Sequence, residues 1–262
     1  IKPHIKDNLL PNYILSNFLF NLLFIIANKI IIISKKSKYF FDSRKILFLL
    51  FNYKIVYIPH PNMIHLRYCQ TSKIFENSGS SLKMLYFGPI LKYKNVELLI
   101  DIINSFENLP IKLDIVGVCN NEYYMELIGR IRNKNIHIIN KYYQDEELFS
   151  LFKQYDICVY PFDKKSSLNS SSIILAFSMS KTVISPNIPT LSDYSNDLYF
   201  SYEYNNYQEH FNNLRNVILK VLNLKNSNNN ILQIIGEKIY EEVRLKNSQE
   251  IINQIYLNIL TN

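Results

Sequence analysis

The sequence has few of the residues that mark fibrous, low-complexity or disulfide-stabilised proteins. Among 262 residues there are only 5 glycines and 9 prolines, which excludes a fibrous or low-complexity chain. The three cysteines, Cys69, Cys119 and Cys158, are odd in number and unevenly spaced. They match neither a disulfide framework nor a metal-binding motif, so we predict a reducing, cytoplasmic setting and no bound metal.

Long apolar runs are missing as well. A membrane-spanning helix needs about 18 uninterrupted apolar residues, and the nearest candidate, residues 14–33, is broken by Ser16, Lys29 and three asparagines. This stretch divides into a helix and a strand. No small-residue cleavage pattern follows it, which argues against a signal peptide. The chain starts at Ile1 rather than at methionine, and we expect further residues before it.

The net charge of +7 and the pI of 9.1 are compatible with an acidic partner, such as a nucleotide diphosphate, an anionic membrane or nucleic acid. The codon bias of an AT-rich gene is the alternative, because Lys, Asn and Ile are abundant throughout. Nucleic acid is the partner we expect least. The 20 Tyr and 16 Phe fall mostly within strands and apolar helix stripes instead of alternating with basic residues on one surface.

Short apolar segments alternate with helical patterns along most of the chain, which is typical of a parallel sheet covered by helices on both faces. Two strands are predicted within residues 29–34 and 54–59. Further strands are predicted within residues 82–88, 111–117, 136–139, 157–161, 182–186 and 197–202. Apolar stripes at helical spacing, such as Val96, Leu99, Ile100 and Ile103, predict helices between them.

We therefore predict an α/β fold with two Rossmann-like domains, of which the first is incomplete. Residues 1–68 would be the end of the first domain, residues 69–225 a complete second domain, and residues 226–262 helices that pack back toward the first. Two parallel strands cannot bury a core by themselves. We expect residues 1–62 to leave apolar surface exposed and to make the chain sticky or oligomeric when it is studied alone.

The loops that follow strands in such a sheet are the expected ligand sites. Gly88 ends one strand and allows a tight turn and a close approach of a ligand. Lys92 and Lys94 follow, just before a helix that begins near Val96. Two ammonium groups beside a helix N-terminus suit a diphosphate. A solvated lysine pair in a lysine-rich protein is the alternative interpretation.

A second loop leads from Pro161 into a helix that begins near Ser172. Asn169, Ser170, Ser171 and Ser172 place hydroxyl, amide and backbone N–H groups at the positive end of that helix, which suits a phosphate. Ordinary N-capping by Ser170 or Ser171 is the alternative. We predict that this loop and the loop after Gly88 meet in one pocket.

Together these segments resemble the donor domain of the family 4 glycosyltransferases and their GT-B relatives, especially bacterial polysaccharide enzymes. The likeness covers most of residues 54–200 and lies in the order of several motifs: YFGPILKYKNVELLIDII, LDIVG, DEELFSLFKQYDICVYPF and SLNSSSIILAFSMSKTVISP. The last motif is similar to a serine-rich version of the family's donor loop. The helix containing IYLNIL resembles the family's final helix.

The resemblance implies transfer of a hexose from a nucleotide-diphosphate donor to a glycan or lipid-linked acceptor in cell-surface polysaccharide synthesis. It implies a retaining reaction with neither a metal nor another cofactor, in the cytoplasm, with contact to the anionic inner membrane. Gly117 and Tyr142 join the donor-binding residues. His4 matches a histidine near the transferred sugar and is the candidate catalytic residue; a lone histidine without a role is the alternative. We expect His60 to shape the crossing between the domains.

Several positions depart from the family pattern. Two glutamates of the family correspond here to Ser167 and Leu175, its phosphate-binding arginine corresponds to Pro89 or Leu91, and its Gly and Pro near the helix end correspond to Ser180 and Thr182. These departures favour the alternative function, a catalytically inactive GT-B remnant that binds a nucleotide sugar or a partner protein.

Overall fold

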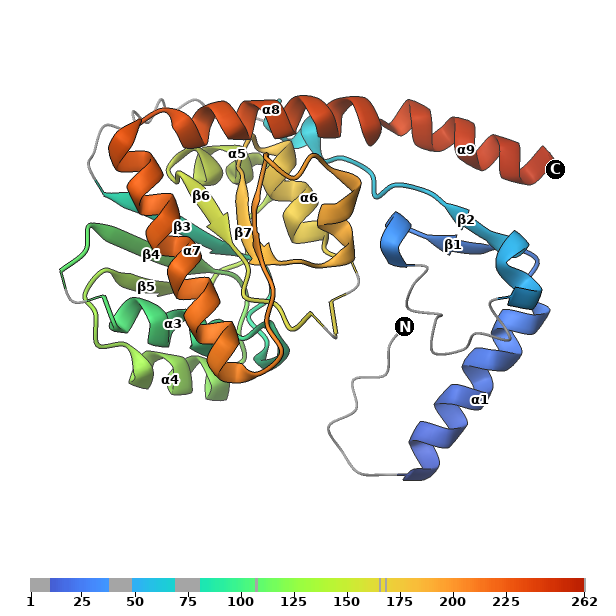
Figure 1. Ribbon diagram of the computed structural model, residues 1–262, viewed down its shortest axis with the longest axis horizontal. Coiled ribbons are helices and arrows are strands. Elements are labelled where there is room, and N and C mark those ends of the chain that lie inside the picture. Colours follow the sequence, from blue (N-terminus) through green and yellow to red (C-terminus); the bar gives the residue numbers. More distant parts are fainter. Residues whose placement is uncertain are drawn as a thin grey trace.

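The structure is a computed structural model that describes residues 10–37, 49–68, 81–106, 108–164, 166–167 and 169–261. It contains a large and a small parallel sheet, with the small sheet to one side of the large one (Figure 1). His4 and Cys69 lie outside the described residues. All eight predicted strands are present, so the prediction of an α/β fold with two parallel sheets is confirmed.

The large sheet has the order β5-β4-β3-β6-β7-β8, and every pair of neighbours is parallel. Its strands are β3 (Leu82–Phe87), β4 (Ile111–Val116), β5 (Ile136–Ile139), β6 (Ile157–Val159), β7 (Val183–Pro186) and β8 (Phe200–Tyr202). The chain builds outward from β3 to β5, returns to β6 beside β3, and then builds outward in the other direction. The strand order therefore reverses between β3 and β6, where sheets of this kind bind ligands beyond the strands' carboxyl ends.

Helices enclose this sheet, as its nearly continuous apolar strands require. They are α3 (Val96–Asn104), α4 (Asn121–Arg130), α5 (Asp145–Lys153), α6 (Ser171–Ser178) and α7 (Tyr207–Ser227). In Figure 1, α7 crosses the face of the sheet, where it contacts β7 and β8. Leu99 of α3, Phe152 of α5 and Phe177 of α6 are fully buried in the common core.

A buried ion pair fixes the end of α7 at the amino edge of the sheet. Lys225 forms a hydrogen-bonded ion pair with Asp156, and its Nζ also donates to the Ser81 carbonyl oxygen at 3.0 Å. Asp156 Oδ2 accepts from the Lys83 N–H at 2.8 Å. These bonds join α7 to the starts of β3 and β6. Since α7 runs antiparallel to the strands, its first turn lies toward their carboxyl ends.

The small sheet consists of β1 (Ile30–Ile32) and β2 (Ile55–Tyr57), which pair in parallel. The helix α1 (Leu10–Ile26) precedes it, and the short 3₁₀ helix η2 (Asn52–Lys54) leads into β2. Phe24 and Ile32 form its buried cluster. Among the described residues, no helix is long and apolar enough to cross a membrane.

Two segments connect the small sheet to the large one. The 3₁₀ helix η3 (Ile64–Arg67) contacts α5, and its Leu66 belongs to the large core. At the other contact, Ser34 Oγ donates to the carbonyl oxygen of Pro189 at 2.6 Å. Pro189 begins the 3₁₀ helix η5 (Pro189–Asp193), so the carboxyl end of β1 lies against the loop that follows β7.

The helices α8 (Ile231–Lys246) and α9 (Gln249–Thr261) run end to end along the top of Figure 1. A Cβ atom on Gly236 of α8 would lie 2.1 Å from the Ser180 carbonyl oxygen, so only glycine allows α8 to approach the end of α6 this closely. Between the two helices, Asn247 Nδ2 donates to the His60 carbonyl oxygen at 2.7 Å. The Asn247 backbone carbonyl accepts from the Asn62 N–H at 2.9 Å.

Candidate nucleotide-binding site

Two glycines allow the end of β4 to lie close to the end of β3, and the end of β3 to lie close to the start of α6. Gly88 (φ +137°) and Gly117 (φ +156°) adopt backbone conformations that side chains disfavour. A Cβ atom on Gly117 would lie 1.9 Å from the Gly88 carbonyl oxygen, and one on Gly88 would lie 3.0 Å from Ser172 Oγ. The carboxyl end of β4 therefore lies against that of β3, and the carboxyl end of β3 lies against the start of α6, where the strand order reverses.

The serines at the start of α6 have different roles. Ser170 is the N-cap, and its Oγ accepts from the Ile173 N–H at 3.3 Å. Its own N–H donates to Thr190 Oγ1 at 3.0 Å, so Ser170 is engaged within the protein. Ser171 and Ser172 are the first helical residues and are not buried. Their N–H groups lack intrahelical acceptors and lie at the positive end of the helix.

Lys94 lies beside a residue that follows β6. It ends the 3₁₀ helix η4 (Lys92–Lys94), and its Nζ lies 4.1 Å from the centre of the Phe162 ring, just after β6. The next residue, Asn95, adopts a left-handed conformation and donates from Nδ2 to the Pro161 carbonyl oxygen at 3.1 Å. Burial lowers the pKa of Lys94. Within the described part of the chain, Lys94 forms no ion pair.

Lys92 points elsewhere, although it is only two residues away. Its Nζ lies 3.4 Å from Glu126 Oε2 of α4, and its side chain is 74% exposed. It also lies over the ring of Tyr123, 5.6 Å from the centre. The structure therefore places Lys94 beside the carboxyl end of β6, and it places Lys92 on the α4 side.

On the α4 side of Gly88 and Gly117, hydrogen bonds join the loops that follow β3, β4 and β5. The Ile90 N–H donates to the Val118 carbonyl oxygen at 3.0 Å. The Asn140 side chain accepts from the Cys119 N–H at 2.9 Å and donates to the Cys119 carbonyl oxygen at 3.1 Å. These bonds continue the ladder beyond the strands. Val118 (53% exposed) and Tyr142 (65% exposed) present apolar and aromatic surface there.

Asn169 lies toward the small sheet, where its Oδ1 accepts from Ser37 Oγ at 3.4 Å. His60 is half-buried at the crossing between the sheets, with Nδ1 2.9 Å from the Pro61 carbonyl oxygen. Ser167 and Leu175, which the sequence resemblance aligned with two glutamates, are both buried. Ser180 has φ +57°, a left-handed conformation that favours glycine.

Sequence reasoning missed three residues of this region. Phe162 underlies Lys94, Asn95 closes the η4 turn, and Thr190 holds the Ser170 N–H. Phe162 directly follows Pro161 and Asn95 directly follows Lys94, so the sequence could have indicated that both lie near the site. Nothing in the sequence links Thr190 to Ser170. Among the described residues, no three His, Cys, Asp or Glu side chains cluster in a way that suits a metal ion.

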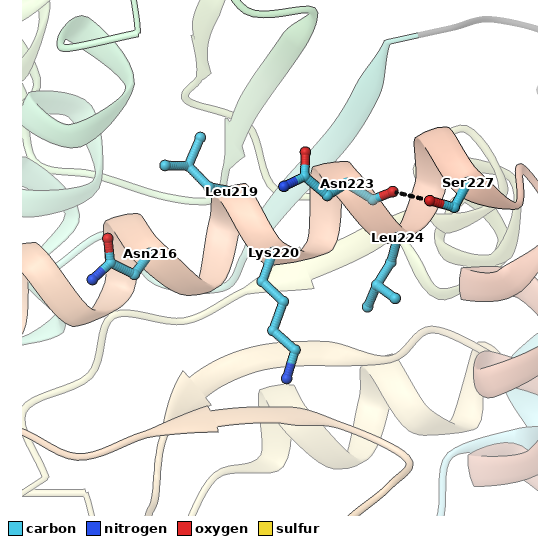
Figure 2. Close-up of a pocket in the computed structure, with 6 residues that line it drawn as sticks. All are labelled: Asn216, Leu219, Lys220, Asn223, Leu224 and Ser227. Atoms are coloured by element: carbon cyan, nitrogen blue, oxygen red, sulfur yellow. Dashed lines mark hydrogen bonds between the residues drawn. The ribbon is translucent and has the colours of Figure 1, made fainter.

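A pocket of about 430 Å³ lies elsewhere, on the half of α7 that runs toward the amino edge of the sheet. Figure 2 shows its six lining residues, Asn216, Leu219, Lys220, Asn223, Leu224 and Ser227, all on that helix. None is a predicted site residue. The adjacent Lys225 contacts the start of β3, at the edge opposite Gly88, so we assign this pocket no part in the site.

No protein-family model matches the sequence, and no curated protein matches it. Solved structures do match its fold. HepE from Anabaena in complex with UDP aligns with a TM-score of 0.71 and 16% identity over 97% of this chain and 70% of that chain. Sucrose-phosphate synthase from Thermosynechococcus elongatus aligns with a TM-score of 0.72 and 14% identity over 93% of this chain and 61% of that chain. A glycosyltransferase from Rickettsia africae aligns with a TM-score of 0.66 and 17% identity over 97% of this chain and 66% of that chain. At such identities the likeness shows the fold, which is GT-B.

Proposed function

We propose that this protein is a glycosyltransferase that takes a hexose from a nucleotide-diphosphate sugar. The observation that carries this proposal is the close approach of Gly88 to the start of α6 at the point where the strand order of a GT-B sheet reverses, with Lys94 over Phe162 just after the neighbouring strand β6. A glycine allows the diphosphate to approach the backbone, an ammonium without an ion pair among the described residues offers charge, and free N–H groups offer hydrogen bonds.

The surroundings of the junction suggest how the donor lies along the sheet edge. On the β4–β5 side, Tyr142 and Val118 offer exposed apolar surface suited to a nucleobase. On the other side, the connection between β6 and α6 is rich in hydroxyl groups and suits a sugar. We infer that the base lies over the β4 and β5 loops, the diphosphate at Gly88, Lys94, Ser171 and Ser172, and the sugar against the β6–α6 connection. HepE, which shares the fold, has been solved with UDP-glucose.

In this arrangement the chain contributes to catalysis by stabilising the departing diphosphate. Lys94 and the N–H groups of Ser171 and Ser172 face the charge that develops as the bond to the sugar breaks. We propose retaining transfer that needs no metal ion. Lys92 assists from the α4 side, and His4 is the candidate group near the sugar.

The acceptor side is proposed from the small sheet. We infer that a glycan or lipid-linked acceptor of cell-surface polysaccharide synthesis enters there, at the cytoplasmic face of a bacterial inner membrane. Two observations support an anionic membrane nearby: α1 exposes several large apolar side chains, and residues 10–37 contain three lysines and no acidic residue. Both features favour contact with anionic lipids.

The second candidate function is a GT-B remnant that binds a nucleotide sugar without transferring it. The residue types at Ser167 and Leu175 favour it, because neither position offers a carboxylate to a sugar hydroxyl. The two candidates share the nucleotide site and differ in turnover, which release of UDP from UDP-glucose measures.

The site is tested by calorimetric titration of UDP, GDP and ADP into wild-type protein, Lys94→Ala and Lys220→Ala. Lys220 is an exposed lysine on α7 and serves as the matched control. We expect Lys94→Ala to weaken binding of the preferred diphosphate by about 1.5–3 kcal/mol, roughly tenfold to hundredfold, and Lys220→Ala to bind as wild type does. Failure of the wild type to bind any of them would refute the function, and unchanged affinity in Lys94→Ala would remove Lys94 from the site.

A further inference from the structure

We propose that Tyr204 is a positioning residue that holds the β6–α6 connection in the conformation that meets the sugar of the donor. The inference rests on the proposed function, and it assigns a role to a residue outside the predicted site. Tyr204 lies between β8 and α7, about 40 positions along the chain from the connection it contacts.

The Tyr204 hydroxyl is bonded to three consecutive residues of the connection. It accepts from the Lys164 N–H at 2.9 Å. Its own proton faces two acceptors, the Phe162 carbonyl oxygen at 3.4 Å and Asp163 Oδ1 at 3.3 Å. Burial raises the pKa of Tyr204 to about 12, so the hydroxyl remains a donor at neutral pH.

The contact to Asp163 extends to the serines that follow. The Asp163 carbonyl oxygen accepts from the N–H groups of Ser166 and Ser167, at 3.1 and 3.0 Å. A shift of Asp163 would therefore move both serines. At the far end, Thr190 holds the Ser170 N–H. The connection is thus held at Tyr204 on one side and at Thr190 on the other, with hydroxyl-bearing residues between.

Tyr204 is itself firmly placed. Its ring stacks on the His210 ring with centres 3.9 Å apart and planes 5° apart. The Nε2 atom of His210 lies 2.9 Å from the hydroxyl of Tyr202, and both side chains are buried. Lys164 adds a second tie, because its Nζ lies 5.0 Å from the centre of the Tyr204 ring and 3.2 Å from Glu203 Oε2. The first turn of α7 and the end of β8 therefore support the connection as one unit.

The function of this support follows from the proposed orientation of the donor. The proposal assigns the diphosphate to Lys94 and the start of α6, and among the described residues no hydrogen bond or ion pair joins these to Tyr204. The residues that Tyr204 holds belong to the part assigned to the sugar. Loss of its hydroxyl should therefore weaken binding of a nucleotide sugar more than binding of the bare nucleotide.

The experiment compares wild-type protein with Tyr204→Phe, which keeps the ring stacked on His210 and removes only the hydroxyl. Tyr207→Phe is the matched control, since it removes a hydroxyl from a nearby tyrosine that is 62% exposed. Affinities for UDP and UDP-glucose are measured by calorimetry. Hydrogen exchange of the Lys164 amide is followed by NMR, and urea unfolding checks that the fold is intact.

We expect Tyr204→Phe to bind UDP-glucose about three- to tenfold more weakly, as loss of a neutral hydrogen bond predicts, with UDP affinity within twofold of wild type and faster exchange at Lys164. Tyr207→Phe should match wild type in all three. Unchanged exchange, or equal weakening for UDP and UDP-glucose, would overturn the positioning role while leaving the nucleotide site intact. A wild-type protein that binds neither ligand would overturn the proposed function and this role together.

Discussion

The two parallel sheets differ in how completely their apolar surface is covered. The large sheet lies within one continuous core in which residues such as Leu99, Phe152 and Ile184 are fully buried. The small sheet's core cluster has two buried members, Phe24 and Ile32. On α1, by contrast, Phe18 and Leu23 are more than 60% exposed. Both sheets are parallel and apolar, so we attribute the difference in burial to the helices that cover the large sheet rather than to strand composition.

The two regions also differ in charge. Residues 10–37 and 49–68 contain Lys29, Lys35, Lys36, Lys54 and Arg67 and no acidic residue. The large sheet and its helices, here called the large unit, contain both acidic and basic side chains. They form several ion pairs, among them Lys225–Asp156 and Arg130–Asp101. Where the two units meet, the large unit supplies the carboxylate, Asp193, to the small one.

The largest expected effect tests the difference in packing with a pair of identical substitutions. Leu99→Ala removes a fully buried side chain and should lower the free energy of unfolding by about 2–5 kcal/mol. Leu23→Ala removes the same atoms from a side chain that is 61% exposed and should change it by no more than about 0.5 kcal/mol. Urea unfolding followed by circular dichroism measures both. Equal losses would mean that α1 is covered as well as α3.

The sequence predicted the large unit well because its signals are local. Each strand is a short apolar run, and Gly88 and Gly117 mark the strand ends that later meet at the site. Strand-to-helix loops in a parallel sheet share one edge, so the meeting of Gly88 with Ser172 follows from topology. The assignment of the bound ligand and of each residue's role remains a prediction.

What the sequence did not reveal depends on long-range contacts. Lys92 and Lys94 have the same residue type and the same loop, yet one meets Glu126 and the other meets Phe162, because the η4 turn sends them to opposite sides. The bond from Tyr204 to Lys164 joins positions 40 residues apart. Neither propensity nor periodicity carries information of that kind.

A smaller effect concerns the buried histidine of the large unit. Burial lowers the pKa of His210 from 6.5 to about 4. Between those pH values the unfolded chain takes up a proton that the folded protein does not, so stability falls as the pH falls through this window, by roughly 2–3 kcal/mol. His210→Phe keeps a ring to stack on Tyr204 and removes the titrating group.

Urea unfolding of both proteins between pH 7 and 4 measures this effect. Loss of the bond to Tyr202 should lower the stability of His210→Phe by about 1 kcal/mol at pH 7, and this difference should shrink as the pH falls and reverse in sign by pH 4, where the wild type has lost more than that amount. Differences that stay constant with pH would show that His210 does not remain neutral in the folded state.

The smallest effect is expected at the interface between the two units. Asp193 Oδ1 accepts from the Lys35 N–H at 3.1 Å, and Oδ2 accepts from the Tyr57 hydroxyl at 3.4 Å. Burial nevertheless raises the pKa of Asp193 above 3.8. At pH values between 3.8 and this raised pKa, the folded state binds more protons than the unfolded state. The contribution of Asp193 to the free energy of unfolding therefore falls as the pH rises through its raised pKa.

Asp193→Asn removes the charge and keeps an oxygen for Lys35 and a polar partner for Tyr57. We expect it to change the free energy of unfolding at pH 7 by less than about 1 kcal/mol, because the Asp193 carboxylate is partly solvated. The stability of the variant relative to wild type should increase as the pH rises from 3.5 to 7. Asp193→Ala is the control that leaves both donors unpaired, and it should cost about 1–3 kcal/mol. Urea unfolding at both pH values measures all three proteins. If Asp193→Asn is as damaging as Asp193→Ala at pH 7, the charge itself holds the small sheet against η5, and the small unit depends on the large one electrostatically as well as through packing.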